Sequence, residues 1–245
     1  MRLWVRLTWV ELKLFVREPV SVVFTFAFPL VVLVVLFGVF GDRPSSAFGF
    51  ARPDDYYLAS YMAVVIAAVS LIALPVHVAT YRERGVMRRL RASSVPAVTL
   101  LSAQVLVSLL LVATGAGVLV AAGLTAYDAS LPVDRADAVL GFAIASLSFL
   151  AVGFLLGHLA RTARAAQAIG MLAFLPMWLL SGAGPPEDLL SDGLQRVAEL
   201  LPLTYAVRAV REPWLGHGSD TTALAVLTLM LVAAGGLATR RVRQL

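Results

Sequence analysis

The residues whose type and spacing point most directly to a chemical role are five arginines in the stretch from Thr80 to Pro96, TYRERGVMRRLRASSVP. No Asp, Glu, Lys or Arg occurs from Tyr56 to Tyr81 before this stretch, or from Ala92 to Tyr127 after it. Such runs are typical of membrane-spanning helices, because about 20 apolar residues cross the hydrocarbon layer. Since guanidinium groups stay charged, the stretch predicts a basic loop between two spans, held on the cytoplasmic side.

Other reactive residues are few. Cysteine is absent and Lys13 is the single lysine, so the sequence has no disulfide, no thiol nucleophile and no G-x-x-x-x-G-K-[ST] phosphate loop. We interpret His77 and His158, near the ends of spans, as packing or interfacial residues, with proton transfer as the alternative. An intramembrane serine protease needs a catalytic histidine on a span that follows its serine. After Ser181 in LLSG the only histidine is His217, in a loop, which excludes this class of enzyme. We expect no cofactor, no metal and no ATP hydrolysis by the chain itself.

The composition is that of a membrane protein. Of the 245 residues 60% are hydrophobic and 14% are charged, against about 25% charged residues in soluble proteins. We assign the net charge of +5 to loops facing anionic lipid rather than to nucleic-acid binding. The sequence therefore predicts an all-α polytopic membrane protein, a single transmembrane domain over residues 1–245, with the lipid bilayer and no nucleic acid among its partners.

Six transmembrane helices organise the predicted domain. Residues 1–18 are expected to form an amphipathic interfacial helix, because the apolar run that follows is too long for a cleavable signal peptide. Pro29 should kink the first span. Residues 184–220 form a long outer loop with two amphipathic helical stretches, either lying on the surface or dipping into the outer leaflet. The predicted spans are about 19–40, 56–79, 97–126, 138–160, 165–183 and 221–238, and residues 80–96 form the basic loop.

The distribution of charge supports this topology. Six spans put both termini on one side, together with fourteen Lys or Arg and three acids. The opposite side carries six arginines and twelve acids. Because basic loops stay inside, we predict that both termini are cytoplasmic.

The basic loop contains a candidate docking helix. On a helical wheel Val86, Met87 and Leu90 fall together, with Glu83 among them, and arginines line the opposite side. A compact apolar surface with a basic flank suits docking into a groove of another protein, and lying on anionic lipid is the alternative. The candidate docking residues are Glu83, Arg84, Gly85, Val86, Met87, Arg88, Arg89, Leu90 and Arg91.

The order of elements resembles the permease subunit of type-2 ATP-binding-cassette exporters. The resemblance is carried by REP at 17–19, RERGVMRRLRASSVP at 82–96, SGAGPP at 181–186 and LLPLTYAVRAVR at 200–211. It implies that 83–91 is a cytoplasmic coupling helix seated in a cleft of a separate ATPase, and that 181–211 is an outer re-entrant region. It also implies two permease copies, as a homodimer or a related heterodimer, with two ATPases. The first outer loop is shorter than is usual in the family.

The resemblance leads us to expect the membrane subunit of an ATP-driven exporter of a hydrophobic or amphipathic compound, with drug or antibiotic efflux favoured. The alternatives are export of a polysaccharide or lipid-linked glycan, a non-transporting membrane scaffold, and a secondary carrier. Bulky side chains on the first and fifth spans could contact such a cargo near the dimer axis, and packing against lipid or helices is the alternative. These candidate pathway residues are Phe24, Phe28, Pro29, Phe174, Met177 and Trp178.

Overall fold

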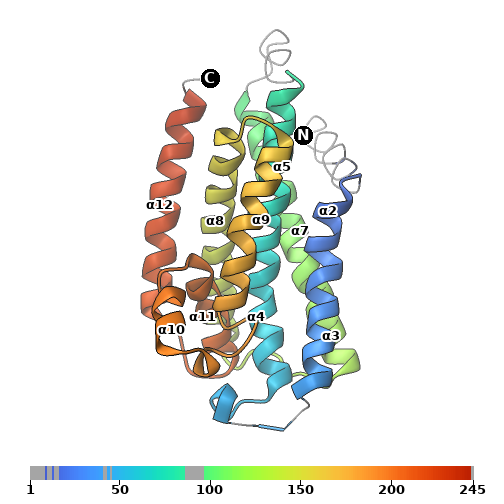
Figure 1. The fold of residues 1–245 in the computed structure, drawn as a ribbon, viewed down its shortest axis with the longest axis vertical. Helices are drawn as coiled ribbons and strands as arrows, with labels where there is room; N and C mark the ends of the chain where they lie inside the picture. Colours follow the sequence, from blue (N-terminus) through green and yellow to red (C-terminus); the bar gives the residue numbers. More distant parts are fainter. Residues whose placement is uncertain are drawn as a thin grey trace.

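The computed structural model describes residues 9, 13, 17–40, 43–44, 46–85 and 97–243. Within these ranges there is no strand, and the long helices run side by side as one bundle (Figure 1). The six helices long and apolar enough to cross a membrane are Pro19–Phe40, Pro53–Glu83, Ser102–Ala126, Arg135–Leu159, Ala163–Leu180 and Thr221–Arg240. The predicted all-α polytopic class is confirmed.

Two of the spans consist of α-helical parts joined by a single π-helical turn. The first span is built from α2 (Pro19–Val22), the π turn η1 (Val23–Ala27) and α3 (Phe28–Phe40). The second is built from α4 (Pro53–Ala68), the π turn η3 (Val69–Ala73) and α5 (Leu74–Glu83). The remaining elements are the short 3-10 helices η2 (Ser46–Phe48) and η4 (Glu187–Leu189), and the helices α7 (Ala97–Ala126), α8 (Arg135–Leu159), α9 (Ala163–Leu180), α10 (Asp192–Ala198), α11 (Pro202–Trp214) and α12 (Thr221–Arg243).

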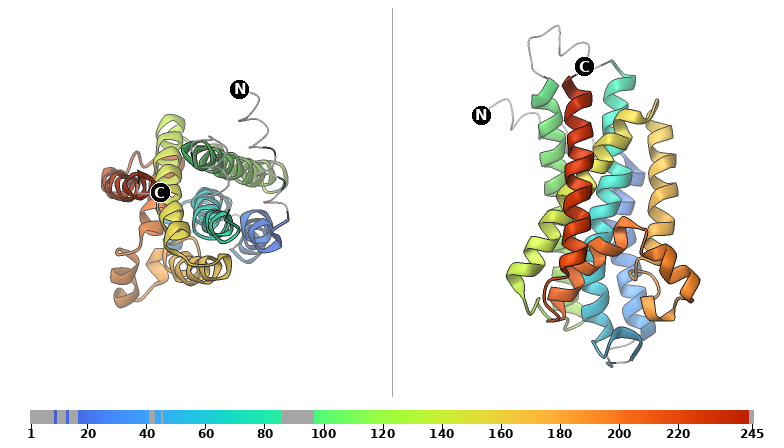
Figure 2. Two further views of the ribbon diagram at one scale, coloured as in Figure 1. Left: turned by 90° about the horizontal axis from the view of Figure 1, so that it is seen from above. Right: turned by 90° about the vertical axis from the view of Figure 1, so that its left-hand side faces the viewer.

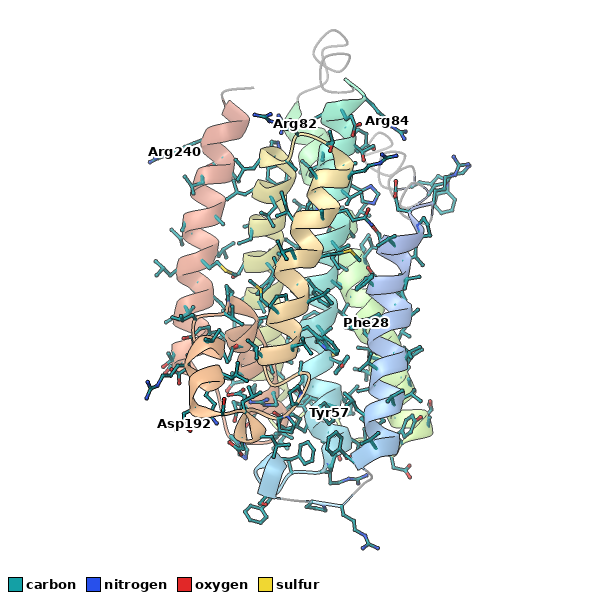
Figure 3. All side chains as sticks on the ribbon, viewed as in Figure 1. Phe28, Tyr57, Arg82, Arg84, Asp192 and Arg240 are labelled. Atoms are coloured by element: carbon teal, nitrogen blue, oxygen red, sulfur yellow. The ribbon has the colours of Figure 1, made fainter. Side chains whose placement is uncertain are left out.

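The two ends of the bundle differ in charge. Figure 3 places Arg82, Arg84 and Arg240 at one end, which we name the Arg82 end, and Asp192 at the opposite end, which we name the Asp192 end. The start of α2 and the finish of α12 lie at the Arg82 end, and η2, α10 and α11 lie at the Asp192 end (Figure 1). Assignment of the Arg82 end to the cytoplasm stays a prediction.

The second span is the centre of the bundle. Of the residues in its apolar window 89% are buried, against 44% or less in every other span. Its parts contact α3, α7, α8, α9 and α11, so these five helices surround it (Figure 2). The span runs from Pro53 to Glu83 where the sequence predicted 56–79, because polar residues at its ends continue the helix beyond the apolar run.

Pro75 explains the π turn in this central helix. Proline has no backbone N–H, so the carbonyl of Leu71, four residues earlier, loses its usual helical donor. Two glycines let neighbouring helices approach the carbonyls of the turn. A Cβ atom at Gly170 of α9 would lie 1.9 Å from the oxygen of Leu71, and one at Gly153 of α8 would lie 1.8 Å from the oxygen of Ser70. Small residues therefore bring α8 and α9 against the centre.

The same relationship between a proline, a carbonyl and a glycine recurs elsewhere in the bundle. The π turn η1 ends two residues before Pro29, the residue at which the sequence predicted a kink. Each freed carbonyl again lies beside a glycine of a neighbouring helix. The two further sets are Pro29 with Thr25 and Gly115, and Pro213 with Ala209 and Gly141.

Candidate functional site

The central helix ends directly before the basic loop. The last turn of α5 contains Arg82 and Glu83, Arg84 is its C-terminal cap, and Gly85 has a φ of +65°. A glycine in this left-handed conformation is a common way to end a helix. Of the nine candidate docking residues the structure describes Glu83, Arg84 and Gly85. The other six, Val86, Met87, Arg88, Arg89, Leu90 and Arg91, lie outside the described residues.

Glu83 is part of the central helix. Helix α5 ends at this residue, Arg84 caps it, and Gly85 follows in the left-handed conformation. Its carboxylate also has a partner within the chain. Glu83 Oε2 accepts a hydrogen bond of 3.0 Å from the backbone N–H of Ala163, the first residue of α9. A donor from another protein is therefore not required to satisfy it.

Ala163 follows the turn that joins α8 to α9. Arg82, beside Glu83, contacts the α8 side of this turn. Its Nη1 atom donates to the carbonyl of His158 in the last turn of α8, and at 3.3 Å to the carbonyl of Ala160. The last carbonyls of a helix and its first N–H groups lack helical partners, and they favour positive and negative charge respectively. Arg82 and Glu83 thus hold both sides of the turn between α8 and α9. We name this pair the α5 clamp.

The six candidate pathway residues come together on η1, α3 and α9. Phe28 stacks on Phe24 with ring centroids 5.3 Å apart, and meets Phe174 edge-on at 5.9 Å and Trp178 at 5.1 Å. Trp178 Nε1 donates a hydrogen bond of 3.1 Å to the hydroxyl of Tyr61 in α4. The structure therefore joins α9 to the first span through aromatic contacts, which we name the aromatic cluster.

Burial separates these residues into two kinds. Phe174 is fully buried and Pro29 is buried, whereas Phe24, Phe28, Met177 and Trp178 are half-buried. A fully buried ring serves packing, whereas a half-buried aromatic face is still free to contact a second molecule. The cluster offers apolar surface and no titratable group, so its chemistry is binding of apolar material. Its contact with a cargo stays a prediction.

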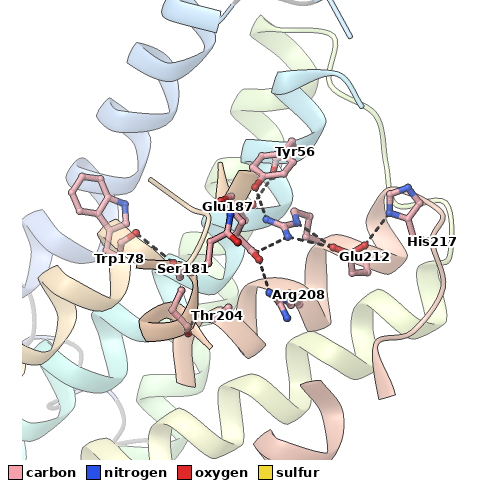
Figure 4. A network of polar contacts seen from close by, with 12 residues as sticks. Tyr56, Trp178, Ser181, Glu187, Thr204, Arg208, Glu212 and His217 are labelled. Atoms are coloured by element: carbon pink, nitrogen blue, oxygen red, sulfur yellow. Dashed lines mark hydrogen bonds and ion pairs between the residues drawn. The ribbon is translucent and has the colours of Figure 1, made fainter. Parts of the chain in front are cut away.

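A network of charged residues lies at the Asp192 end (Figure 4). Arg211 of α11, with a side chain 7% exposed, donates to the hydroxyl of Tyr56 at 2.7 Å and to Glu187 at 3.0 Å. Its guanidinium also lies 4.5 Å from the centre of the Tyr56 ring. Arg208 pairs with Glu187 at 2.5 Å, and Glu212 contacts both Arg211 at 3.3 Å and His217 at 2.9 Å. This network fixes α11 to the start of α4.

The charges in this network sustain one another. Burial would raise the pKa of the Glu187 carboxyl, but the hydrogen bond from Arg208 and the charge of Arg211 lower it overall. The pKa of Arg208 is raised by its hydrogen bond to Glu187. Gly182, with a φ of +79°, provides the space, since a Cβ there would lie 2.9 Å from Glu187 and 3.0 Å from Arg211. The SGAGPP segment therefore closes over this buried ion pair.

Helix α11 is packed into the bundle at this end. It contacts α4, α8 and α12, and most of one face is buried, from Leu203 to Trp214. Thr204 Oγ1 donates a hydrogen bond of 2.6 Å to the carbonyl of Ala198, which ties α11 to α10. Both readings of the outer loop, lying on the surface or dipping into the outer leaflet, place apolar surface against the bundle, and α11 packs in this way.

Neither polar arrangement was predicted from the sequence. Arg82 was interpreted as a loop charge and Glu83 as a docking residue, and Glu187, Arg211 and Tyr56 were not connected. One signal was present for each. Gly85 marks the place where a helix can end, and Arg208 and Arg211, three positions apart, share one face of an amphipathic helix.

The remaining candidates fit structural roles. His158 Nδ1 lies 2.9 Å from the carbonyl of Phe154, and its ring lies 4.3 Å from the Phe154 ring. These contacts fit the packing role that we assigned to it. Across the described parts of the chain no group of His, Cys, Asp and Glu has the arrangement of a metal site.

The fold and these sites define a multi-pass membrane protein with a charged helix end at one side, an apolar aromatic cluster within, and a packed helical cap at the other side. Comparison with known protein families also identifies the chain as a membrane protein. The chain belongs to the ABC-2 type transporter family, which matches residues 2–214. Membership of this family agrees with the multi-pass membrane fold described above.

A known relative is similar to part of this chain. Nodulation protein J of Neorhizobium galegae is 34% identical to this chain over 91 residues. The match covers 37% of this chain and 33% of that protein, so the chain spans about a third of the relative's length. This similarity supports the family.

Proposed function

We propose that this chain is the membrane subunit of an ATP-driven exporter that moves a hydrophobic or amphipathic compound, with drug or antibiotic efflux as the favoured subclass. The observation that carries this proposal is the half-buried face of Phe24, Phe28 and Trp178 in the aromatic cluster. Aromatic rings of this kind bind apolar groups through area and stacking without requiring charge. Membership of the ABC-2 type transporter family supports transport as the activity.

The energy source in this proposal is a separate ATPase subunit. The chain has no phosphate loop of its own, and residues 86–91 offer the apolar and basic side chains that a docking site needs. The partner would thus bind directly after the α5 clamp. A second permease copy, identical or related, would complete the transport unit.

Orientation is part of the same proposal, because the ATPase is cytoplasmic. The Arg82 end should face the cytoplasm and the Asp192 end the outside. Since the chain has no cysteine, single cysteines can be labelled on intact cells without background. We expect an impermeant maleimide to label Asp192→Cys and to spare Arg84→Cys. The reverse pattern would overturn the orientation.

The proposed activity is tested by purifying the tagged chain from membranes and identifying the proteins that remain bound. We expect a soluble ATPase with a phosphate loop, and ATP-dependent accumulation of a lipophilic fluorescent dye by inside-out vesicles that contain both proteins. Dye accumulation driven by a proton gradient alone would indicate a secondary carrier. A bound ATPase with no dye transport, but with transport of a lipid-linked glycan, would replace the cargo class. Absence of both ATPase and transport would favour a scaffold.

A further inference from the structure

The α5 clamp connects two regions that the proposed function keeps apart. We infer that Arg82 and Glu83 are positioning residues. They transmit movement of residues 86–91, which we name the docking segment, through α9 to the aromatic cluster. This inference rests on the proposed function. The loop expected to contact the ATPase begins immediately after Gly85. Any displacement of this loop acts first on the last turn of α5, where both residues lie.

The clamp cannot release the turn between α8 and α9 gradually. Arg82 contacts the carbonyls of His158 and Ala160, and Glu83 contacts the N–H of Ala163. Because the two residues are adjacent in sequence and bind opposite sides of the turn, a shift of α5 must either move the turn with it or break both sets of bonds. The bonds also match the dipoles of both helices, positive charge at the end of α8 and negative charge at the start of α9.

Helix α9 carries the displacement to the cluster. Ala163 is its first residue and Phe174 lies about 16 Å further along its axis, at about 1.5 Å per residue. Phe174 and Trp178 contact Phe24 and Phe28 of the first span through their rings. A shift or rotation of α9 would therefore change the space between Trp178 and Phe28 directly.

The central helix is built to let its two halves move differently. At the Asp192 end Tyr56 of α4 is tied to Arg211, and at the Arg82 end α5 is tied to the turn between α8 and α9. Between the two ties lies the π turn η3. Turns of this kind interrupt the regular helical hydrogen bonds. Movement of α5 would accordingly be passed to α9 at the Arg82 end, on the other side of η3 from the contact between Tyr56 and Arg211.

The first experiment tests the clamp in the permease alone. Hydrogen exchange is measured on the chain in lipid nanodiscs for the wild type, Glu83→Ala and Arg240→Ala. Arg240 is the control, since it is an exposed arginine at the same end of the bundle and lies on α12, outside the candidate docking residues. Loss of a bond to a helix N-terminus should raise exchange in the first turn of α9 by about fivefold. Unchanged exchange in Glu83→Ala would overturn the clamp.

The second experiment tests transmission in the complex with the co-purified ATPase. Leu172, 77% exposed on α9, is changed to cysteine and labelled with an environment-sensitive fluorophore, and ATP is added. We expect Glu83→Ala and Arg82→Ala each to reduce the ATP-driven signal about fivefold or more, while the ATPase stays bound and keeps its basal hydrolysis. Glu83→Gln, which keeps an accepting oxygen, should retain part of the signal. Arg240→Ala should behave as the wild type.

These measurements separate the inference from the proposed function. If no ATPase co-purifies with the wild type, the proposed function fails, and hydrogen exchange still decides whether the clamp exists. If the ATPase binds and the double variant Arg82→Ala/Glu83→Ala gives the full signal at position 172, transmission through the clamp is wrong. Loss of bound ATPase in the double variant would place these residues in docking, which also overturns the inference. Glu83→Gln provides the milder test should the alanine variants fold poorly.

Discussion

Leu71 and Gly170 lie where the backbones of the central helix and α9 approach each other closely. The Leu71 carbonyl, deprived of its helical donor by Pro75, lies so near Gly170 that an added Cβ would be 1.9 Å from the oxygen. No side chain fits at such a distance, and Gly153 occupies the equivalent position on α8. Two glycines thus allow two helices to pack on the π turn η3, so the irregular backbone is covered by protein rather than by lipid.

Gly170→Ala should destabilise the bundle. The added methyl group must push α9 away from backbone atoms, and overpacking of this kind costs about 1–3 kcal/mol. The measurement is the unfolding temperature in detergent followed by size-exclusion chromatography. Gly117→Ala on α7 is the control, because nothing lies within 4 Å of a Cβ there. Equal melting of the two variants would contradict close packing at Gly170.

Arg211→Met should lower stability more than Arg208→Gln. Arg211 is buried and bonds to Tyr56, Glu187 and Glu212, so its removal leaves carboxylates without their buried partner. Breaking a buried ion pair from one side costs about 3–5 kcal/mol. Arg208 is about 29% exposed, and solvent compensates its loss. The test is chemical or thermal unfolding of both variants, and an equal loss in both would show that Arg211 has no special role.

Protonation of Glu187 at low pH should lower the stability of the protein. Its pKa lies below the ordinary value of 4.5, because the hydrogen bond from Arg208 and the charge of Arg211 outweigh the opposing effect of burial. A lowered folded pKa means that Glu187 contributes stability fully above pH 4.5 and loses it as the pH falls through the folded pKa. The unfolding temperature of the wild type should therefore decrease below pH 4.5, and that of Glu187→Gln should depend less on pH in the same range. Parallel curves for the two proteins would exclude this contribution.

The number of spans could be predicted because a membrane imposes few choices. Uncharged runs of about 20 residues have to be helices, since lipid offers no partner for a free N–H or carbonyl. The charged residues next to the apolar runs did not predict where the helices end. Arg82 and Glu83 extend α5 beyond the apolar run, because bonds to the next helices satisfy them, and composition does not reveal those bonds.

Contacts between distant residues were beyond the reach of the sequence. Tyr56 and Arg211 are 155 positions apart, and their meeting depends on how α11 folds back over α4. The structure brings aromatic residues of the first and fifth spans together, and their role as a substrate pathway stays a prediction. Bulky residues on the first and fifth spans indicated a shared surface, but the full burial of Phe174 depends on the packing of α9 and has no local signature.

The aromatic cluster should respond to mutation in two ways. Phe174→Ala removes a fully buried ring and should cost about 3–5 kcal/mol in stability. Phe28→Ala and Trp178→Ala remove half-buried rings and should change the preference among transported dyes while leaving membrane insertion intact. Tyr61→Phe removes only the hydrogen bond to Trp178 and serves as the mild control. Equal loss of transport for every dye, with poor expression, would instead assign Phe28 and Trp178 to packing.

The docking segment and the clamp should give opposite failures. Val86 and Leu90, which lie outside the described residues, form the predicted apolar contact with the ATPase, and truncating a buried interface anchor costs about 2 kcal/mol or more. Leu90→Asp or Val86→Asp should therefore release the ATPase, whereas Arg91→Gln should weaken the complex mildly and mainly at raised salt. Glu83→Ala should keep the ATPase bound and uncouple it, since Glu83 already bonds to Ala163. Co-purification and ATP hydrolysis distinguish these results, and an ATPase that remains bound and coupled in Leu90→Asp would mean that this segment rests on lipid.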